Sequence, residues 1–346
     1  MGIRIFIFAI LSLATASAQL KFAVSGDSRN CGDVVMPLIA ADATKQGAQF
    51  YWHLGDFRAM FQMDEDMTLR AQPKREMSIT DYISAAWPDA IDNQIAAFGN
   101  VPFYAGIGNH EMYFGRTRND FIAQFADWLN LPNIQAQRLR DDPHDHRVKT
   151  YFHWVQGGVD FIYLDNATPD MFDAAQMRWL TAVLKRAAAN KDVRTVVVAM
   201  HAALPDSLAA HHSMNDNPQL ADSGRKVYQQ LVDFHQTTKK PLYILASHSH
   251  FYMANIFNTE PNRARNAVLP GWIVGTAGAY NYKLPEDYKE ADAAATDIYG
   301  YLIANVEPNG EIKFVFREVK ESDVTPEART KFGPELMKYC FQDNHE

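Results

Sequence analysis

The chain has 346 residues, 47% of them apolar or aromatic, so it can bury the core of one large domain or two small ones. Its 41 acidic and 33 basic side chains give a formal net charge of −8, which argues against a polyanion-binding surface and therefore against nucleic acid as a partner. A small anionic substrate would have to be attracted by local positive charge, such as that of bound metal ions.

Residues 1–18 have the pattern of a secretory signal peptide. Arg4 supplies a basic start, residues 5–14 an apolar stretch, and residues 16–18 a cleavage site of small side chains. The apolar stretch is too short to span a bilayer, no other segment is long enough, and no cysteine follows the cleavage site to accept a lipid. We therefore expect a soluble, secreted or periplasmic protein without a membrane partner. No repeat or linker interrupts residues 19–346, which predicts a single domain.

The chain contains two cysteines, Cys31 and Cys340, at its opposite ends. In an oxidising compartment they could form a disulfide that ties the C-terminal tail to the region of the first strand. Two buried free thiols are the alternative, and it is the one we favour.

The chain opens with a strand, a helix and a second strand. The apolar residues 21–26 predict a strand that ends at Asp27, and apolar side chains at helical spacing predict a helix over residues 33–46. Residues 50–55 predict the next strand, which ends at Asp56. This order is typical of an open α/β sheet.

The following elements are read from the same patterns of apolar spacing, helix caps and turn residues. Helices are predicted at residues 78–98 (kinked or divided by Pro88), 121–129, 173–190, 223–237 and 326–339, with a loop or short helix at 57–75. Strands are predicted at residues 101–107, 195–200, 241–247, 251–257 and 271–276, with hairpins at 151–164 and 299–319. The Asp- and His-rich residues 141–146 and the pair His211-His212 are interpreted as surface loops rather than as metal ligands.

Five of the predicted strands end in a side chain that can bind a metal. Because open α/β sheets form their ligand crevice outside the carboxyl ends of the strands, we expect these side chains to converge on one site. The candidate ligands are Asp27, Asp56, Asn109, His201, His248 and His250.

This mixture of oxygen and imidazole ligands suits two divalent or trivalent ions of Zn, Fe or Mn, and does not suit Ca²⁺, which prefers oxygen ligands only. Two such ions can neutralise the attacking and leaving oxygens of a phosphoryl displacement. His110, next to Asn109, is predicted to be catalytic and to contact the substrate, because it can protonate the leaving alkoxide. Glu111 could orient the His110 imidazole. His53 is interpreted as a buried core histidine, and Asp165 and Asn166 as supporting or turn residues.

The chain resembles the calcineurin-like metallophosphoesterases, a family that includes the purple acid phosphatases. The resemblance covers nearly all of residues 19–346 and rests on the following motifs: Gly26-Asp27, Gly55-Asp56, Gly108-Asn109-His110-Glu111, Met200-His201 and Ser247-His248-Ser249-His250. It implies an α/β fold, a four-layer α-β-β-α sandwich of two mixed sheets flanked by helices.

The resemblance also implies a role for each ligand. Asp56 would bridge the two ions, Asp27 and His250 would hold one of them, and the remaining candidate ligands would hold the other. In this arrangement Asn109 contacts both metal and substrate.

The chain departs from the family pattern at three positions. Arg29 occupies the place of a common His ligand, and a guanidinium cannot bind a metal; it could instead grip a substrate phosphate or form a salt bridge with a carboxylate. Ala59 stands where purple acid phosphatases have a Tyr, so their charge-transfer iron centre is not expected. Ser247 replaces the usual Gly before His248, which is a mild steric change.

The sequence therefore predicts an exported, metal-dependent phosphoesterase that hydrolyses small phosphate esters by attack of a metal-bound hydroxide at a dinuclear site. Phosphomonoesters and phosphodiesters both remain candidate substrates. The alternative, motivated by Arg29, is a degenerate phosphoesterase that binds metal or a phosphorylated ligand without turnover.

Overall fold

The computed structural model describes residues 19–74, 76–167, 172–209, 212–216 and 218–346. Residues 1–18, where we predict the signal peptide, and His211 lie outside this part of the chain. Within the described residues, no helix is both long enough and apolar enough to cross a membrane.

The first sheet has five strands and joins the first strand of the described chain to its last two. In spatial order they are β12 (Ile312–Val319), β11 (Tyr299–Val306), β1 (Lys21–Ser25), β2 (Tyr51–His53) and β3 (Phe103–Ala105). β1, β2 and β3 run parallel, and β11 pairs antiparallel with β1 on one side and with β12 on the other. The sheet is therefore mixed, and the three parallel strands all end at the same edge.

The second sheet has seven strands. In spatial order they are β10 (Ala293–Ala295), β8 (Tyr252–Ala254), β9 (Gly271–Val274), β7 (Leu242–Ser247), β6 (Thr195–Ala202), β5 (Val159–Leu164) and β4 (Phe152–Gln156). The four central strands, β9, β7, β6 and β5, are parallel. β8 and β4 pair antiparallel with the two ends of this set, and β10 pairs antiparallel with β8. The predicted hairpins, β4–β5 and β11–β12, are both present.

Aromatic side chains join the inner faces of the two sheets. Phe50 packs against Trp154 with ring centroids 5.5 Å apart, and Trp52 packs against the same ring at 5.2 Å. In β6, Val197 and Ala199 belong to this inner core, whereas alternate residues of the same strand face the outer helices. Side chains alternate between the two faces of a strand, so a strand buried on both faces reads as a continuous apolar run.

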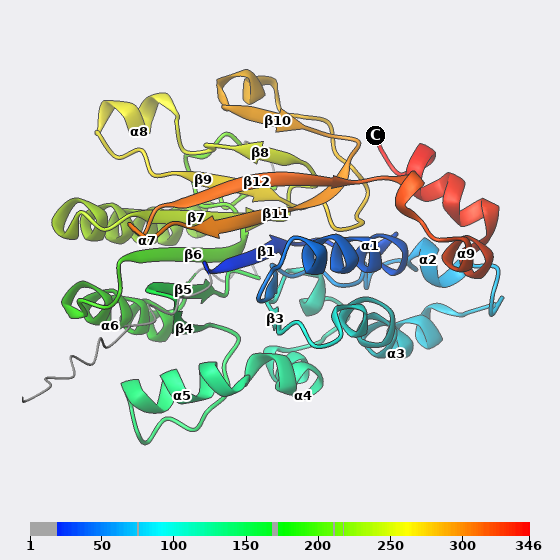
Figure 1. The fold of residues 1–346 in the computed structure, drawn as a ribbon, viewed down its shortest axis with the longest axis horizontal. Coiled ribbons are helices and arrows are strands. Elements are labelled where there is room, and N and C mark those ends of the chain that lie inside the picture. The colour runs from blue at the N-terminus through cyan, green and yellow to red at the C-terminus, as the bar shows by residue number, and fades with distance from the viewer. Residues whose placement is uncertain (1–18, 75, 168–171, 210–211, 217) are drawn as a thin grey trace, which may run out of the picture.

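Helices cover the outer faces of both sheets (Figure 1). The α-helices are α1 (Gly32–Lys45), α2 (Glu65–Thr68), α3 (Ile79–Ala90), α4 (Arg118–Leu129), α5 (Pro132–Asp141), α6 (Ala174–Ala189), α7 (Pro218–Thr238), α8 (Glu260–Ala264) and α9 (Pro326–Lys338). α1 packs against β11 and β12, and apolar side chains of α6 and α7 pack on the second sheet. The predicted fold, two mixed sheets flanked by helices, is confirmed.

Each helix and strand predicted from the sequence is present, although its ends differ by a few residues. Two α-helices and one strand of the described chain, α5, α8 and β10, were not predicted. Pro88 does not divide α3, as Ala90 is its last residue and the chain continues as a π-helix, Ile91–Ile95, and a 3₁₀ turn, Ala96–Phe98.

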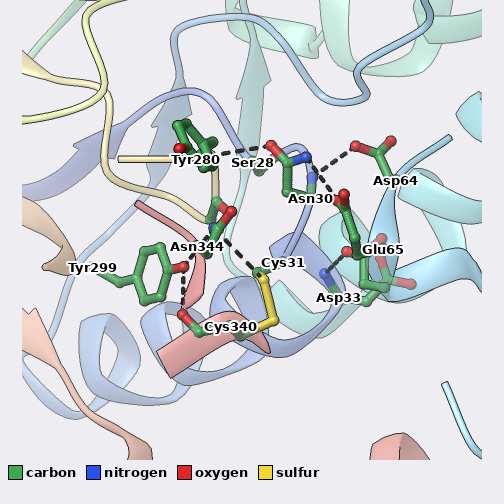
Figure 2. Close-up of a disulfide and its surroundings, with 12 residues drawn as sticks. Ser28, Asn30, Cys31, Asp33, Asp64, Glu65, Tyr280, Tyr299, Cys340 and Asn344 are labelled. Carbon is green, nitrogen blue, oxygen red and sulfur yellow. Dashed lines mark hydrogen bonds between the residues drawn. A yellow bond between two sulfur atoms is a disulfide. The ribbon is translucent and has the colours of Figure 1, made fainter. Parts of the chain in front are cut away.

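The prediction of two free thiols is wrong, because Cys31 and Cys340 form a disulfide with their Cα atoms 5.7 Å apart. Figure 2 shows this bond between the start of α1 and the turn that follows α9, with Asn344 beside it. The Asn344 amide donates to the hydroxyl of Tyr299 at 2.7 Å, and this hydroxyl donates to the carbonyl of Cys340. The C-terminal tail is therefore fixed against the loop that follows β1.

Candidate metal centre

The predicted ligands lie at one edge of both sheets, where the parallel strands end. Asp27 follows β1, Asp56 follows β2, and His248 follows β7. These three residues have positive φ angles of 61°, 60° and 67°, a backbone conformation that residues other than glycine adopt infrequently. Such local strain is typical of sites where the backbone must aim a functional side chain.

Two groups of possible ligand atoms meet at this edge and share one carboxylate. The first group is Asp27, Asp56 and His250, the second is Asp56, His201 and His248, and the atoms of each group lie within 4.8 Å of one another. A shared carboxylate between two ligand groups is the arrangement that two neighbouring ions require.

The unsatisfied atoms of the cluster fit a cation. Asp27 Oδ1 and Asp56 Oδ2 are buried and have no hydrogen-bond partner, although they lie 3.2 Å from His250 Nε2 and 3.3 Å from His201 Nε2 respectively. Buried polar atoms without partners cost free energy, so they point to a missing ligand.

The imidazole rings are oriented as metal ligands would be. His201 Nδ1 donates to the carbonyl of Leu54 at 3.0 Å, and His250 Nδ1 donates to the carbonyl of Tyr280 at 2.7 Å. His201 Nε2 lies 2.9 Å from Asn109 Oδ1, so a cation that replaces the Nε2 proton would meet the lone pairs of both atoms. A bound cation would satisfy both lone pairs.

Charge interactions set the protonation states in this cluster. Burial raises the pKa of Asp27, but the contact with His250 and the charge of His201 outweigh it and lower this pKa to about 2. Burial lowers the pKa of His201, but Asp56 and Asp27 raise it to about 9. The carboxylates are thus charged at neutral pH and can bind cations.

Buried residues behind the ligands fix their positions. The side-chain oxygen Oδ1 of Asn166 accepts from the backbone N–H groups of His201 and Ala202, each at 3.2 Å. Ser247 Oγ lies 3.2 Å from His201 Nδ1, so the serine at the family's glycine position fits beside the ligand. Asp165 makes two bonds to Arg118 and lies outside both ligand groups.

Glu111 does not orient the His110 imidazole, as proposed from the sequence. Its carboxylate instead accepts backbone N–H groups of Asp56 and Phe57, each at 2.9 Å, and of Gly108 at 2.7 Å. Burial and the charge of Asp56 raise the pKa of Glu111 to about 7. Glu111 therefore ties the turn after β2 to the turn after β3.

His110 and Arg29 form a pair beside the candidate ligands. Arg29 Nη1 donates to His110 Nε2 at 2.9 Å, while His110 Nδ1 donates to the carbonyl of Ala59. Burial and the positive charge of Arg29 lower the pKa of His110 to about 4, against the opposing charge of Asp56. The second guanidinium nitrogen, Nη2, donates to the hydroxyl of Tyr282 at 3.1 Å.

The salt bridge considered for Arg29 is not present among the described residues, where its recorded side-chain partners are two histidines and a tyrosine. A buried network holds its loop: the backbone N–H of Asn30 donates to Asp64 at 2.7 Å, a bond that Figure 2 also shows, and that of Asp33 donates to Asp66 at 2.8 Å. The loop is therefore anchored on α2.

Sequence reasoning missed the contribution of Tyr282. Its ring stacks on His250 with centroids 4.1 Å apart and on His212 at 4.4 Å. His212 is an exposed loop residue outside both ligand groups, as predicted, but its ring lies beside the site, 5.6 Å from that of His248. No motif surrounds Tyr282 in the sequence, and its neighbours Asn281 and Lys283 bond to the C-terminal tail, which only the complete fold brings there.

Two further predictions are settled. His53 is a buried core residue, as expected, with Nε2 3.0 Å from Ser28 Oγ and its ring stacked on Phe57. Residues 141–146 form the end of α5 and a loop, and Asp141 pairs with His153 at 2.7 Å rather than joining either ligand group.

Comparison with solved structures identifies the fold. The chain matches a purple acid phosphatase, PPD1, from yellow lupin (Lupinus luteus) seeds with a TM-score of 0.55 and 16% identity, covering 87% of this chain and 52% of that one. It matches PhoD with a TM-score of 0.51 and 14% identity, covering 87% and 72%. It also matches GAP50, the anchor in the inner membrane complex of Plasmodium, with a TM-score of 0.51 and 12% identity, covering 87% and 84%. The chain thus spans about half the length of the lupin protein, and these likenesses describe the fold alone.

No curated protein matches the chain. The sequence model of the family described as Calcineurin-like phosphoesterase matches residues 21–252, which is more than half of the chain and includes all six candidate ligands. The chain belongs to the calcineurin-like phosphoesterase family.

Proposed function

We propose that this protein is an exported, metal-dependent phosphoesterase that hydrolyses small phosphate esters at a dinuclear site. The observation that carries the proposal is the pair of ligand groups that share Asp56 at the edge of both sheets. Membership of the phosphoesterase family and the fold shared with a purple acid phosphatase support the same chemistry.

Each candidate ligand has a place in this proposal. Asp27 and His250 would hold one ion, Asn109, His201 and His248 would hold the other, and Asp56 would contact both. Zn, Fe and Mn suit this set of oxygen and nitrogen donors. When bound, two such ions lower the pKa of water and neutralise charge on the phosphoryl oxygens.

The neighbouring side chains would then bind the substrate and move a proton. Arg29 presents a buried guanidinium, which forms strong charge-assisted hydrogen bonds with phosphate oxygens. A phosphate bound beside His110 raises the pKa of this imidazole, because negative charge favours the protonated form. Once Arg29 donates to the phosphate instead of to His110 Nε2, that nitrogen can carry a proton, and His110, held at Nδ1 by the Ala59 carbonyl, would give it to the departing alcohol.

The test is elemental analysis of the purified protein followed by phosphate release from a panel of phosphomonoesters and phosphodiesters under Mn, Zn and Fe loading. His110→Ala should retain its metal content and lose roughly 10²–10⁴-fold in turnover. His144→Ala, which removes an exposed histidine, serves as the matched control. Equal loss of metal and turnover in His110→Ala would contradict the catalytic role.

Export is tested separately by fractionating expressing cells and sequencing the N-terminus of the mature protein. The proposal requires the protein outside the cytoplasm with a new N-terminus near Gln19. Full-length protein that remains in the cytoplasm would contradict it.

A second candidate function rests on Arg29. Its Nη2 lies 3.4 Å from His250 Nε2, so a fixed positive charge stands beside one of the two ligand groups. Repulsion between this charge and a cation would weaken that half of the site and leave a protein that binds metal or phosphate without turnover. Protein that carries metal and binds phosphate, yet hydrolyses nothing under any metal loading, would favour this function.

A further inference from the structure

An exposed aromatic cluster stands beside His110. Phe61, in the loop after β2, is 46% exposed, and Tyr113, directly after the 3₁₀ turn His110–Met112, is 40% exposed. Both rings contact the His110 ring, with centroids 5.2 Å and 5.0 Å away, and lie 5.7 Å from each other. Large aromatic side chains are normally buried, so a cluster of them at the mouth of a site needs an explanation.

The backbone supports the exposed position of these rings. Met60, just before Phe61, has a positive φ of 63°, and Phe114, just after Tyr113, has a positive φ of 54° and is 58% exposed. This conformation is unusual for bulky residues and recurs at ligand clamps. Both turns thus hold their aromatic side chains toward solvent beside the site rather than in the core.

We infer that Phe61 and Tyr113 bind the alcohol part of the substrate, and that the preferred substrates are phosphate esters whose alcohol carries a flat aromatic ring. This inference rests on the proposed function, in which His110 meets the leaving oxygen. An oxygen hydrogen-bonded to His110 Nε2 lies about 3 Å from that atom, so a ring attached directly or through one or two carbons reaches both aromatic side chains. The rings offer stacking and edge-to-face contacts.

Charge near the cluster favours the same occupant. The guanidinium carbon of Arg29 lies 5.8 Å from the centroid of the Phe61 ring, so the phosphate-binding group and the aromatic wall are neighbours. A ligand with an anionic phosphate and an adjacent aromatic ring matches this pair of surfaces. Phe61 brings no side-chain hydrogen-bonding group, so the contact selects for a flat ring and not for a particular pattern of polar groups.

The experiment compares two esters of equal intrinsic reactivity. 2-Phenylethyl phosphate and 2-cyclohexylethyl phosphate release primary alcohols of similar pKa and size, and differ in the flatness and π-system of the ring. For the metal-loaded wild type we expect kcat/KM to favour the phenyl ester by about two- to tenfold, the range for an aromatic contact. Phe61→Leu and Tyr113→Leu, which keep an apolar side chain at an exposed position, should each bring this ratio closer to one.

Tyr288→Leu is the matched control. Tyr288 is an exposed tyrosine, 37% accessible, on another element, Glu286–Glu290, and its loss should leave the ratio of the two esters unchanged. A wild-type ratio near one, or a ratio that neither the Phe61 nor the Tyr113 substitution changes, would overturn the inference. In that result the phosphoesterase activity itself would still stand.

If the protein hydrolyses neither ester nor any other ester of the panel, the proposed function is contradicted. The binding of two non-hydrolysable analogues then tests the role of Phe61 and Tyr113 by itself. 2-Phenylethylphosphonate and 2-cyclohexylethylphosphonate, titrated by calorimetry into the same metal-loaded protein, should differ in Kd by the same factor. The difference should shrink in Phe61→Leu. Equal binding of the two phosphonates, or binding of neither, would overturn the inference.

Discussion

Removing the disulfide should destabilise the folded chain strongly. Cys31 and Cys340 are 309 positions apart, so the bond closes a loop that includes nearly all of the described chain. In the chain-entropy relation, a loop of this length lowers the entropy of the unfolded state by about 19 cal/mol/K, or about 5–6 kcal/mol at 25 °C. Measured values usually fall below this relation, so we expect a loss of about 3–5 kcal/mol in Cys31→Ser/Cys340→Ser.

The measurement is guanidinium unfolding of the oxidised wild type and of the double variant at the same metal loading. The double variant should unfold at lower denaturant with a larger m-value, because its unfolded chain has no crosslink and exposes more surface. A reducing agent should lower the stability of the wild type toward that of the variant and leave the variant unchanged. This comparison separates the crosslink from any effect of the serine side chains.

Two results would refute this reasoning. Titration of two free thiols in the unfolded, unreduced wild type would show that the bond does not form. A loss below about 1 kcal/mol in the double variant would show that the unfolded chain is already restricted or that the crosslinked ends contribute no net stability.

Three further predictions concern other parts of the chain. Burial lowers the pKa of His153, but Asp141 and Asp160 raise it to about 9, which is above the unfolded value. Protonated His153 therefore stabilises the folded state by about 3 kcal/mol, and this contribution is complete below about pH 6.5 and lost as the pH rises through 9. Urea unfolding between pH 6 and 10 should show this loss in the wild type and not in His153→Gln. Gly108→Ala should bind less metal and lose about 2–3 kcal/mol of unfolding free energy, because its Cβ would lie 2.1 Å from Asp56 Oδ1. A metal content equal to that of the wild type would contradict this prediction. Removing the metal with a chelator should lower the thermal unfolding midpoint of the metal-loaded wild type. If free metal had been at 100 times its Kd, the unfolding free energy should fall by about 2.7 kcal/mol. An unchanged midpoint would argue against a bound ion.

The sequence predicted the framework of the site because that framework depends on local patterns. β6 and β7 are buried on both faces and read as continuous apolar runs, and turn residues mark where each run ends. The side chains that follow, such as His201 and His248, could therefore be assigned to one edge. The fold class followed from the resemblance to the calcineurin-like metallophosphoesterases, which rests on the motifs that contain these side chains.

The errors concern contacts that no local pattern encodes. The disulfide joins residues that only the complete fold brings together, and α5 was missed because its polar composition gives a weak apolar stripe, with Ile134 and Gln137 as its buried residues. Glu111 was assigned to its neighbour His110, whereas its carboxylate reaches across to the backbone of a different strand end. Tyr282 could not be placed because it contacts His250, His212 and Arg29, which only the complete fold brings to it.

The pairing of β1 with β11 also has a consequence for biosynthesis. Lys21 lies opposite Asn305, so β1, in the middle of the first sheet, lacks one of its two partner strands until β11 has been synthesised. Until then the nascent chain presents an apolar strand with an open edge, a template for association with other chains. We therefore expect the first sheet to form only after β11 has left the ribosome, and the chain to depend on holding chaperones wherever the synthesis of β11 is delayed.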